Sequence, residues 1–192
     1  DWSSDVCSSD LTSSLGKKLQ ALVSAYNDAQ TVLNVTSDPK STVANGGGTL
    51  ANDSIVNQLR SALVSLVTTD SKVTSNDVSA LRQLGVSLEQ DGTLSFKPDK
   101  LAALIASKSF SDVALMLTNG KDNSADIAYQ TDTGHGFAAD TAMGLRDLIA
   151  PKGVIDIANQ AATDDVKDQN TRTSDLAARM QLLLDRKSTR LN

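Results

Sequence analysis

The stretch LGKKLQALVSAYNDAQTVL, residues 15–33, decides the fold class of this chain. Its apolar positions recur at alternating intervals of four and three residues, which places them in one narrow stripe along an α-helix. A lone helix of this length is only marginally stable in water, so the stripe predicts a packing partner. The stripe is formed by Leu15, Leu19, Leu22, Tyr26, Ala29 and Leu33.

A second stripe with the same spacing lies near the other end of the chain. Two of its positions, Gln169 and Thr173, are polar, which weakens burial but can fix the register of paired helices. The two stripes predict either a coiled-coil leg built from both helices or two amphipathic helices in an ordinary bundle. The second stripe consists of Ala162, Val166, Gln169, Thr173, Leu176, Met180 and Leu183.

Between the stripes, the sequence predicts a helix and a β-hairpin. Residues 52–54, Asn-Asp-Ser, offer an N-cap for a helix with one apolar face over residues 55–67. A short helical turn over residues 78–84 should end at Gly85. Alternating apolar residues then flank Asp91-Gly92, the strongest short-range signal for a hairpin turn.

Further helices are predicted from Pro98 onward. Proline is favoured in the first turn of a helix, and a second apolar turn follows at residues 110–117. Residues 119–136 are polar and predict a loop, and residues 137–149 predict a helix that stops before Pro151 and Gly153. The predicted fold class is therefore mainly α, an antiparallel helical bundle or coiled-coil leg with one small β-hairpin.

Both ends of the chain have the sequence expected of translated sequencing-adapter oligonucleotide, in opposite orientations. These segments are DWSSDVCSSDL, residues 1–11, and DRKSTRLN, residues 185–192. The alternative is a natural Ser/Asp-rich tail and a natural basic tail. We expect the natural part to be one helical domain over residues 12–184, and this part then has neither Cys nor Trp, because Cys7 and Trp2 lie in the first segment.

Composition excludes several classes of function. Aromatic residues are 3% of the chain and hydrophobic residues 40%, so a core of Leu, Val, Ile and Ala is expected, as in helix-on-helix packing. No apolar run approaches the ~20 residues that span a bilayer, so no membrane insertion is expected. A net charge of −5 without a Lys/Arg cluster disfavours nucleic-acid binding.

Candidate chemical sites are few. His135, the single histidine, lies between two glycines without a neighbouring motif for a nucleophile or an orienting carboxylate. Asp122, Ser124 and Asp126 have the spacing of a calcium loop, but Thr133 stands where the bidentate glutamate belongs. We therefore expect no catalytic residue, no cofactor and no metal site, although an unrecognised enzyme that uses His135 remains an alternative.

A series of short motifs follows one order along the chain. The motifs are Ala25-Tyr26-Asn27, Gly48-Thr49-Leu50 with Asp53-Ser54, Leu84-Gly85-Val86, Asp91-Gly92-Thr93-Leu94, Lys100-Leu101, Gly136-Phe137-Ala138 and Gly153-Val154-Ile155. In this order, and over residues 22–184, the chain resembles the C-terminal region of bacterial flagellar filament cap proteins, the hook-associated protein 2 family, although no single motif is specific. The loop at residues 119–136 matches no motif of the family.

The resemblance implies a structural assembly protein rather than an enzyme. It implies a ring-shaped homo-oligomer, a pentamer in this family, at the extracellular distal tip of the flagellum, which promotes flagellin polymerisation, prevents subunit loss and contributes to cell adhesion. Its partners would be further copies of itself and flagellin. The packing seam expected to build the leg comprises Leu15, Leu19, Leu22, Tyr26, Leu33, Val166, Leu176, Met180 and Leu183. The alternative is a secreted helical adhesin or coiled-coil structural protein.

Overall fold

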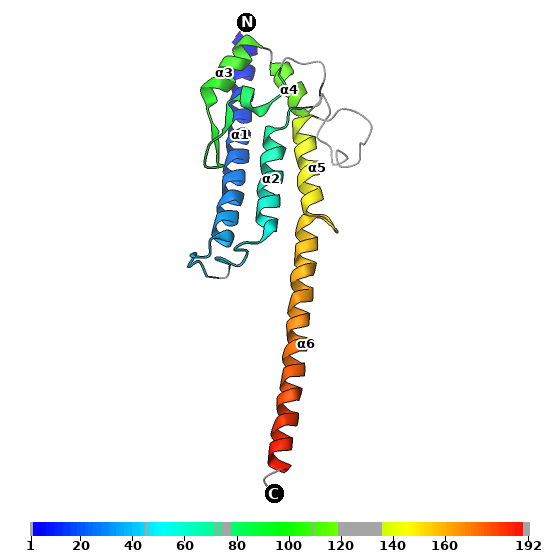
Figure 1. The fold of residues 1–192 in the computed structure, drawn as a ribbon. Coiled ribbons are helices and arrows are strands. Elements are labelled where there is room, and N and C mark those ends of the chain that lie inside the picture. Colours follow the sequence, from blue (N-terminus) through cyan, green and yellow to red (C-terminus); the bar gives the residue numbers. More distant parts are fainter. Residues whose placement is uncertain are drawn as a thin grey trace. The chain divides into compact units, whose positions relative to one another are not determined.

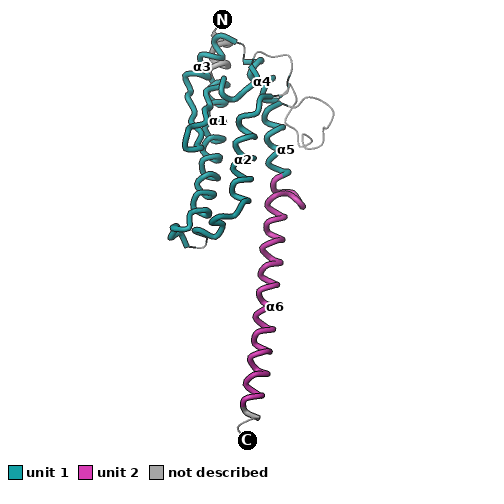
Figure 2. Tube along the Cα trace, in the orientation of Figure 1, with its two compact units in different colours: residues 1–147 teal, residues 148–192 magenta. Residues whose placement is uncertain are grey.

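A computed structural model describes residues 2–44, 46–71, 73, 78–108, 110–118 and 136–189. The chain forms two compact units, residues 1–147 and residues 148–192 (Figure 2). The described part is mainly helical with one two-stranded antiparallel sheet, which confirms the predicted fold class. Nearly all of the predicted loop, together with His135 and the calcium-like residues, lies outside the described residues.

Two antiparallel helices form the long axis of the first unit (Figure 1). Helix α1 spans Trp2–Ser37, and helix α2 spans Ser54–Thr68. Asp53 caps α2 as predicted, because its Oδ1 accepts a hydrogen bond from the Ile55 amide at 3.0 Å. The Arg60 guanidinium of α2 donates to Asn34 Oδ1 at 2.7 Å and to Ser37 Oγ at 3.1 Å, which ties the end of α1 to α2.

The predicted hairpin is present with strands β1 (Val86–Leu88) and β2 (Leu94–Phe96), in the register Val86↔Phe96. Its loop is longer than the two-residue turn that Asp-Gly favours. Gly92 adopts a positive φ of 83°, whereas Asp91 contributes through its side chain, whose Oδ1 accepts from the Thr93 amide at 3.0 Å and the Thr93 hydroxyl at 2.7 Å. Asp91 therefore acts as an Asx turn residue.

Asn27 of α1 acts as a third partner of the hairpin. Its Nδ2 donates to the Leu94 carbonyl at 2.9 Å, and its Oδ1 accepts from the Leu94 amide at 2.8 Å. The side-chain amide thus satisfies both backbone groups of Leu94, in the way that a neighbouring strand would. This pair of bonds fixes the hairpin against α1 across 67 residues of sequence.

The remaining elements of the first unit complete its core. They are the 3₁₀ turn η1 (Leu81–Leu84), α3 (Pro98–Ser107), α4 (Phe110–Thr118) and α5 (Phe137–Ile149), which begins and ends where the sequence predicts. Each contributes side chains to one continuous apolar cluster with α1, α2 and the hairpin. Its most deeply buried side chains are Val78, Leu81, Leu84, Leu101, Val113 and Met116.

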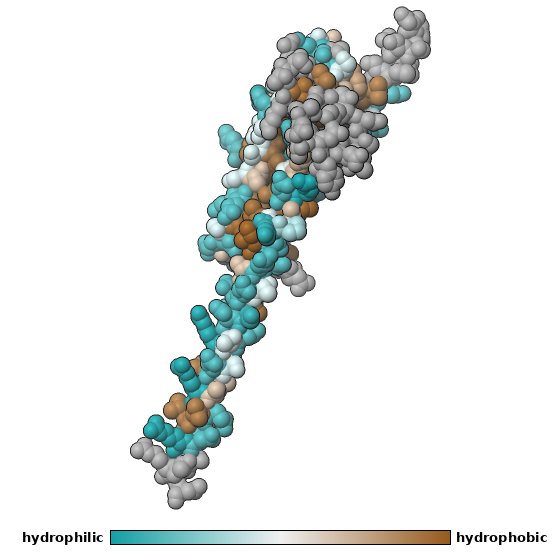
Figure 3. All heavy atoms as spheres, turned by 90° about the vertical axis from the view of Figure 1, so that its right-hand side faces the viewer, coloured by the Kyte–Doolittle hydropathy of each residue, from teal (hydrophilic) through white to brown (hydrophobic). Residues whose placement is uncertain are grey.

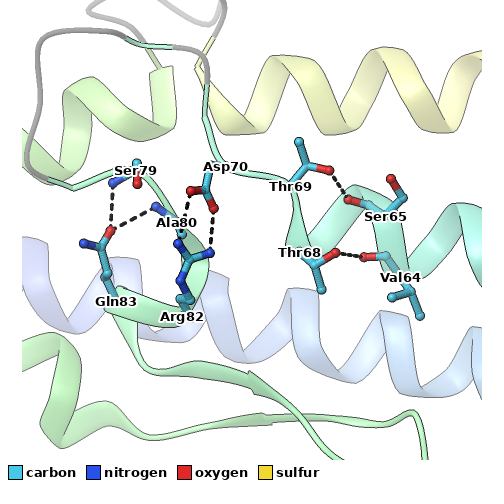
Figure 4. A network of polar contacts seen from close by, with 9 residues as sticks. All are labelled: Val64, Ser65, Thr68, Thr69, Asp70, Ser79, Ala80, Arg82 and Gln83. Carbon is cyan, nitrogen blue, oxygen red and sulfur yellow. Dashed lines mark hydrogen bonds and ion pairs between the residues drawn. The ribbon is translucent and has the colours of Figure 1, made fainter.

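A network of polar contacts joins the C-terminal end of α2 to η1 (Figure 4). Arg82 contacts both carboxylate oxygens of Asp70, at 2.6 and 3.1 Å. Gln83 Oε1 accepts from the amides of Ser79, at 2.7 Å, and Ala80, at 3.0 Å. These contacts satisfy backbone groups ahead of η1, where Ala80 has no side-chain acceptor of its own.

We expect the pKa of Asp70 to lie below its ordinary value of 3.8, because the Arg82 guanidinium donates hydrogen bonds to the carboxylate and attracts its charge. Since the pKa is lowered on folding, the contribution of this pair to stability is present above about pH 4 and is lost as the pH falls through the folded-state pKa. A carboxyl NMR titration should show this pKa rising toward the ordinary value in Arg82→Ala.

The matched control is Asp91 in the same titration. Its pKa is also lowered, by hydrogen bonds from the Thr93 hydroxyl and amide, and it owes nothing to Arg82. Arg82→Ala should therefore leave Asp91 unchanged. If Asp70 titrates identically in both proteins, the ion pair does not form in solution. The Arg82 and Asp70 side chains are 62% and 48% exposed, so we expect only a small change in overall stability.

The second unit is dominated by helix α6, which spans Val154–Thr189. Between α5 and α6, Pro151 and Gly153 interrupt the helix as the sequence predicts. Among the described residues, no single helix is long and apolar enough to span a membrane. Helices α3 and α4 meet that criterion of length and composition only when they are taken together across a 113° bend.

Candidate assembly surfaces

The α1 stripe lies in the core of the first unit. Leu19, Tyr26 and Leu33 are buried, with 4%, 5% and 8% of their surface exposed, and Leu15 and Leu22 pack against the cluster while partly buried. Their neighbours in the cluster come from α2, α3 and the hairpin. The α1 residues of the predicted packing seam therefore lie together in the structure. Other residues of unit 1 cover them.

Two further α1 residues are buried that the sequence reasoning left out. Val23 and Gln30 join Leu19, Tyr26 and Leu33 in a buried row with its own 4, 3, 4, 3 spacing. The Gln30 amide donates to the Tyr26 hydroxyl at 3.0 Å, which supplies a partner for a polar side chain that is only 6% exposed. Val23 was detectable from its spacing, whereas nothing in the sequence marks Gln30 as buried.

The α6 stripe is exposed in the second unit. Val166 is 60% exposed, and the other three predicted residues, Leu176, Met180 and Leu183, are 61%, 58% and 64% exposed. Figure 3 shows a mostly hydrophilic α6 surface with hydrophobic side chains gathered near its C-terminal end. An exposed apolar row on a polar helix indicates a surface that binds another chain or segment.

The flanks of the α6 stripe differ in charge. At the helical repeat of 3.6 residues, Asp165, Arg172 and Arg179 border the stripe on one side, while Asn170 and Ala177 border it on the other. All five side chains are exposed. Because flanking charges select the partner and its direction in paired helices, a helix that covers this stripe should place acidic residues opposite Arg172 and Arg179.

A groove in the first unit lies between α1 and α3. It has a volume of about 750 Å³ and continues from the end of β2. Small residues on both helices keep it open, and Lys17 and Asp99 place one charge of each sign at it. Its main apolar lining is formed by Gly16, Phe96, Leu101, Ala102, Ile105 and Ala106.

The described residues show little of the chemistry that a catalytic centre requires. A cavity of about 280 Å³ is lined by α2 and α5, with the carboxylates of Asp70, Asp140 and Asp147 at its wall, and Asp70 is already paired with Arg82. In the part of the chain that the structure describes, no three His, Cys, Asp or Glu side chains are placed to hold a metal ion.

The described part of the chain is therefore a mainly helical protein with one hairpin, whose long helix α6 carries an exposed apolar row. The family described as flagellar hook-associated protein 2, C-terminus, matches residues 8–192. The chain therefore belongs to this family, and the resemblance found in its sequence motifs is confirmed.

A solved structure agrees with this assignment. The chain is similar to the flagellar cap protein FliD of Escherichia coli, in a crystal structure of its D1, D2 and D3 domains, with 25% identity and a TM-score of 0.51. The match covers 78% of this chain and 35% of that chain. No curated protein sequence matches the chain.

Proposed function

We propose that this chain is the helical leg region of a protein that caps the flagellar filament at its distal, extracellular tip. In this proposal, copies form a ring, promote flagellin polymerisation, prevent subunit loss and take part in cell adhesion. Family membership supports the proposal, and the single structural observation that carries it is the exposed apolar row of α6. Five copies are expected from the family resemblance.

The two units have different tasks in this proposal. The first is a packed body whose core uses the α1 stripe, so that it presents a fixed surface. The second presents the α6 stripe, with Leu176, Met180 and Leu183 as its apolar centre, to other helices of the assembly. The pairing of the α6 stripe with the α1 stripe stays a prediction. Polar faces of both units would make weak, exchangeable contacts with flagellin.

We expect charge in the α6 stripe to prevent assembly. In the full-length protein, Leu176→Glu with Met180→Glu places two carboxylates where apolar surface should be covered, and burying an unpaired charge is costly. Light scattering should show loss of the ring-sized species, and a cap-deficient strain that carries this variant should fail to grow filaments.

The matched control places the same two charges away from the stripe. Ala178→Glu with Gln181→Glu changes exposed residues elsewhere on α6 and should leave both the ring and filament growth intact. If the stripe variant also assembles normally, α6 is not the assembly surface. If the unmodified full-length protein is a monomer or dimer that does not restore growth, the cap function itself is wrong and the secreted helical adhesin is favoured.

A further inference from the structure

Helix α6 has no covered face over most of its length. Every residue from 159 to 187 is exposed. A helix that stands alone in water is only marginally stable, because packing of one face normally supplies most of its stability. The stripe of α6 is the face that a partner helix would cover, and the residues in the stripe and beside it restrict what that partner can be.

The stripe reads almost the same in both directions along α6. Its two polar residues, Gln169 and Thr173, lie at the centre, with apolar residues on either side. A second copy of α6 can therefore lie antiparallel to the first with polar residues beside polar ones and apolar residues beside apolar ones. The layers of this arrangement, each formed twice, are Ala162 with Met180, Val166 with Leu176, and Gln169 with Thr173.

Other antiparallel alignments mix apolar and polar residues. A shift of the second copy by one heptad places Met180 beside Gln169 in one direction and Val166 beside Gln169 in the other. A side-chain amide that is buried against an apolar side chain loses its hydrogen bonds to water and gains no partner. The stripe therefore favours one antiparallel register, in which the Gln169 amide and the Thr173 hydroxyl are partners for each other.

The charges beside the stripe favour the antiparallel direction over the parallel one. In this register, Asp165 of each copy lies beside Arg179 of the other, which gives two pairs of opposite charge. In a parallel pair with the same layers matched, Asp165 would lie beside Asn170 and Arg179 beside Leu184, so neither charge would have a partner. The one unfavourable contact is between the two copies of Arg172, which lie near the two-fold axis. Their side chains are exposed, so this repulsion is small.

The charge of the whole helix has the same direction. Residues 154–168 contain four Asp and one Lys, a net charge of −3, whereas residues 169–184 contain two Arg and one Asp, a net charge of +1. A parallel pair would set two acidic segments side by side. An antiparallel pair sets each acidic segment beside a basic one.

We propose that the α6 stripe binds the α6 stripe of a second copy of this chain, antiparallel, with Gln169 beside Thr173 and Asp165 beside Arg179. The inference rests on the proposed function, because it names the partner of the surface assigned there to assembly. A two-fold contact joins only two copies, so a ring also requires a second contact elsewhere on the chain.

The test uses single-cysteine variants of the full chain in a Cys7→Ser background, treated with a short bis-maleimide cross-linker. Asn170→Cys lies beside the same residue of the second copy in the proposed register, so it should link to itself and give a covalent dimer. Ala177→Cys lies on the same flank one heptad later, beside Thr163 of the second copy, and alone it should stay monomeric. A mixture of Ala177→Cys and Thr163→Cys chains should give the dimer. All three positions are exposed.

Two results of the cross-linking would overturn the pairing. A monomer or a parallel pair gives no dimer from Asn170→Cys. Chains that collide without a fixed register give as much dimer from Ala177→Cys as from Asn170→Cys.

A charge exchange tests the register without cysteines, with the dissociation constant of the dimer measured by sedimentation equilibrium. Arg179→Asp sets like charges together twice and should weaken the dimer about tenfold. Adding Asp165→Arg restores opposite charges and should bring the constant back to within about twofold of the unmodified chain. A double variant no tighter than Arg179→Asp alone would show that these residues do not meet. If the pairing fails in this way while Leu176→Glu with Met180→Glu still abolishes the ring, the stripe binds a different helix and the proposed function stands.

Discussion

Replacing Asn27 by alanine is expected to lower the free energy of unfolding of unit 1 by about 3 kcal/mol. The change removes two hydrogen bonds at once and leaves the amide and carbonyl of Leu94 without partners, at about 1–3 kcal/mol for each buried unsatisfied group. Leu94 itself is only 5% exposed, so water reaches these groups poorly. The loss should appear although alanine is the better helix former. Urea unfolding followed by the NMR signals of β2 measures it.

Two further variants separate the hydrogen bonds from other effects. Asn27→Asp keeps an acceptor for the Leu94 amide but turns a carboxylate toward the Leu94 carbonyl, so it should be destabilised at least as strongly at neutral pH. Ser24→Ala changes an exposed residue one turn earlier on α1 and should have little effect. If Asn27→Ala unfolds at the same urea concentration as Ser24→Ala, the side chain does not hold the hairpin.

Local signals were sufficient to predict most elements of the fold. The Asp53 cap, the start of α3 at Pro98 and the interruption at residues 151–153 each rest on a backbone property of one or two residues. Such properties act over a single turn, so their outcome hardly depends on distant parts of the chain. The β-hairpin was predictable for the same reason, because its strands are joined by a short loop.

Contacts between distant residues were not predictable from one sequence. In the sequence, Asn27 cannot be distinguished from any other polar residue of a helix. Its hydrogen bonds to Leu94 depend on a strand 67 residues away. Gln30 was missed for a different reason, because a polar side chain enters a core only where a specific partner receives it, and that partner is Tyr26, one helical turn away. The sequence predicts a hairpin turn at Asp91-Gly92, but it does not show that the longer loop is held by the Asp91 side chain, which accepts from the Thr93 amide.

The α6 stripe illustrates a different limit. Its spacing predicts which residues share a face, and Leu176, Met180 and Leu183 are all exposed in the second unit. The partner that covers that face is another helix or another copy of the chain. The spacing of the stripe residues does not identify this partner. The arginines beside it, Arg172 and Arg179, add a condition on the charge of the partner, which is information that apolar spacing alone does not carry.

Replacing Gly85 by alanine is expected to have the largest effect, a loss of about 4 kcal/mol in the free energy of unfolding of unit 1. Gly85 follows η1 with a φ of 91°, a region that costs other residues about 1–2 kcal/mol. A Cβ there would lie 2.5 Å from the Lys97 carbonyl oxygen and 3.1 Å from Lys100 Cβ. Overpacking of this kind costs about 1–3 kcal/mol more.

Gly92 supplies a matched control for this prediction, because it separates the two costs. Its φ of 83° is nearly the same, but a Cβ on Gly92 meets nothing within 4 Å. Gly92→Ala should therefore lose only about 1–2 kcal/mol, the cost of the backbone conformation alone. The excess for Gly85→Ala measures the close approach of Gly85 to Lys97, whose amide also donates to the Gly85 carbonyl at 2.9 Å. Equal losses in the two variants, from urea unfolding followed by the β2 signals, would show that this approach is looser in solution and that backbone conformation alone requires glycine at residue 85.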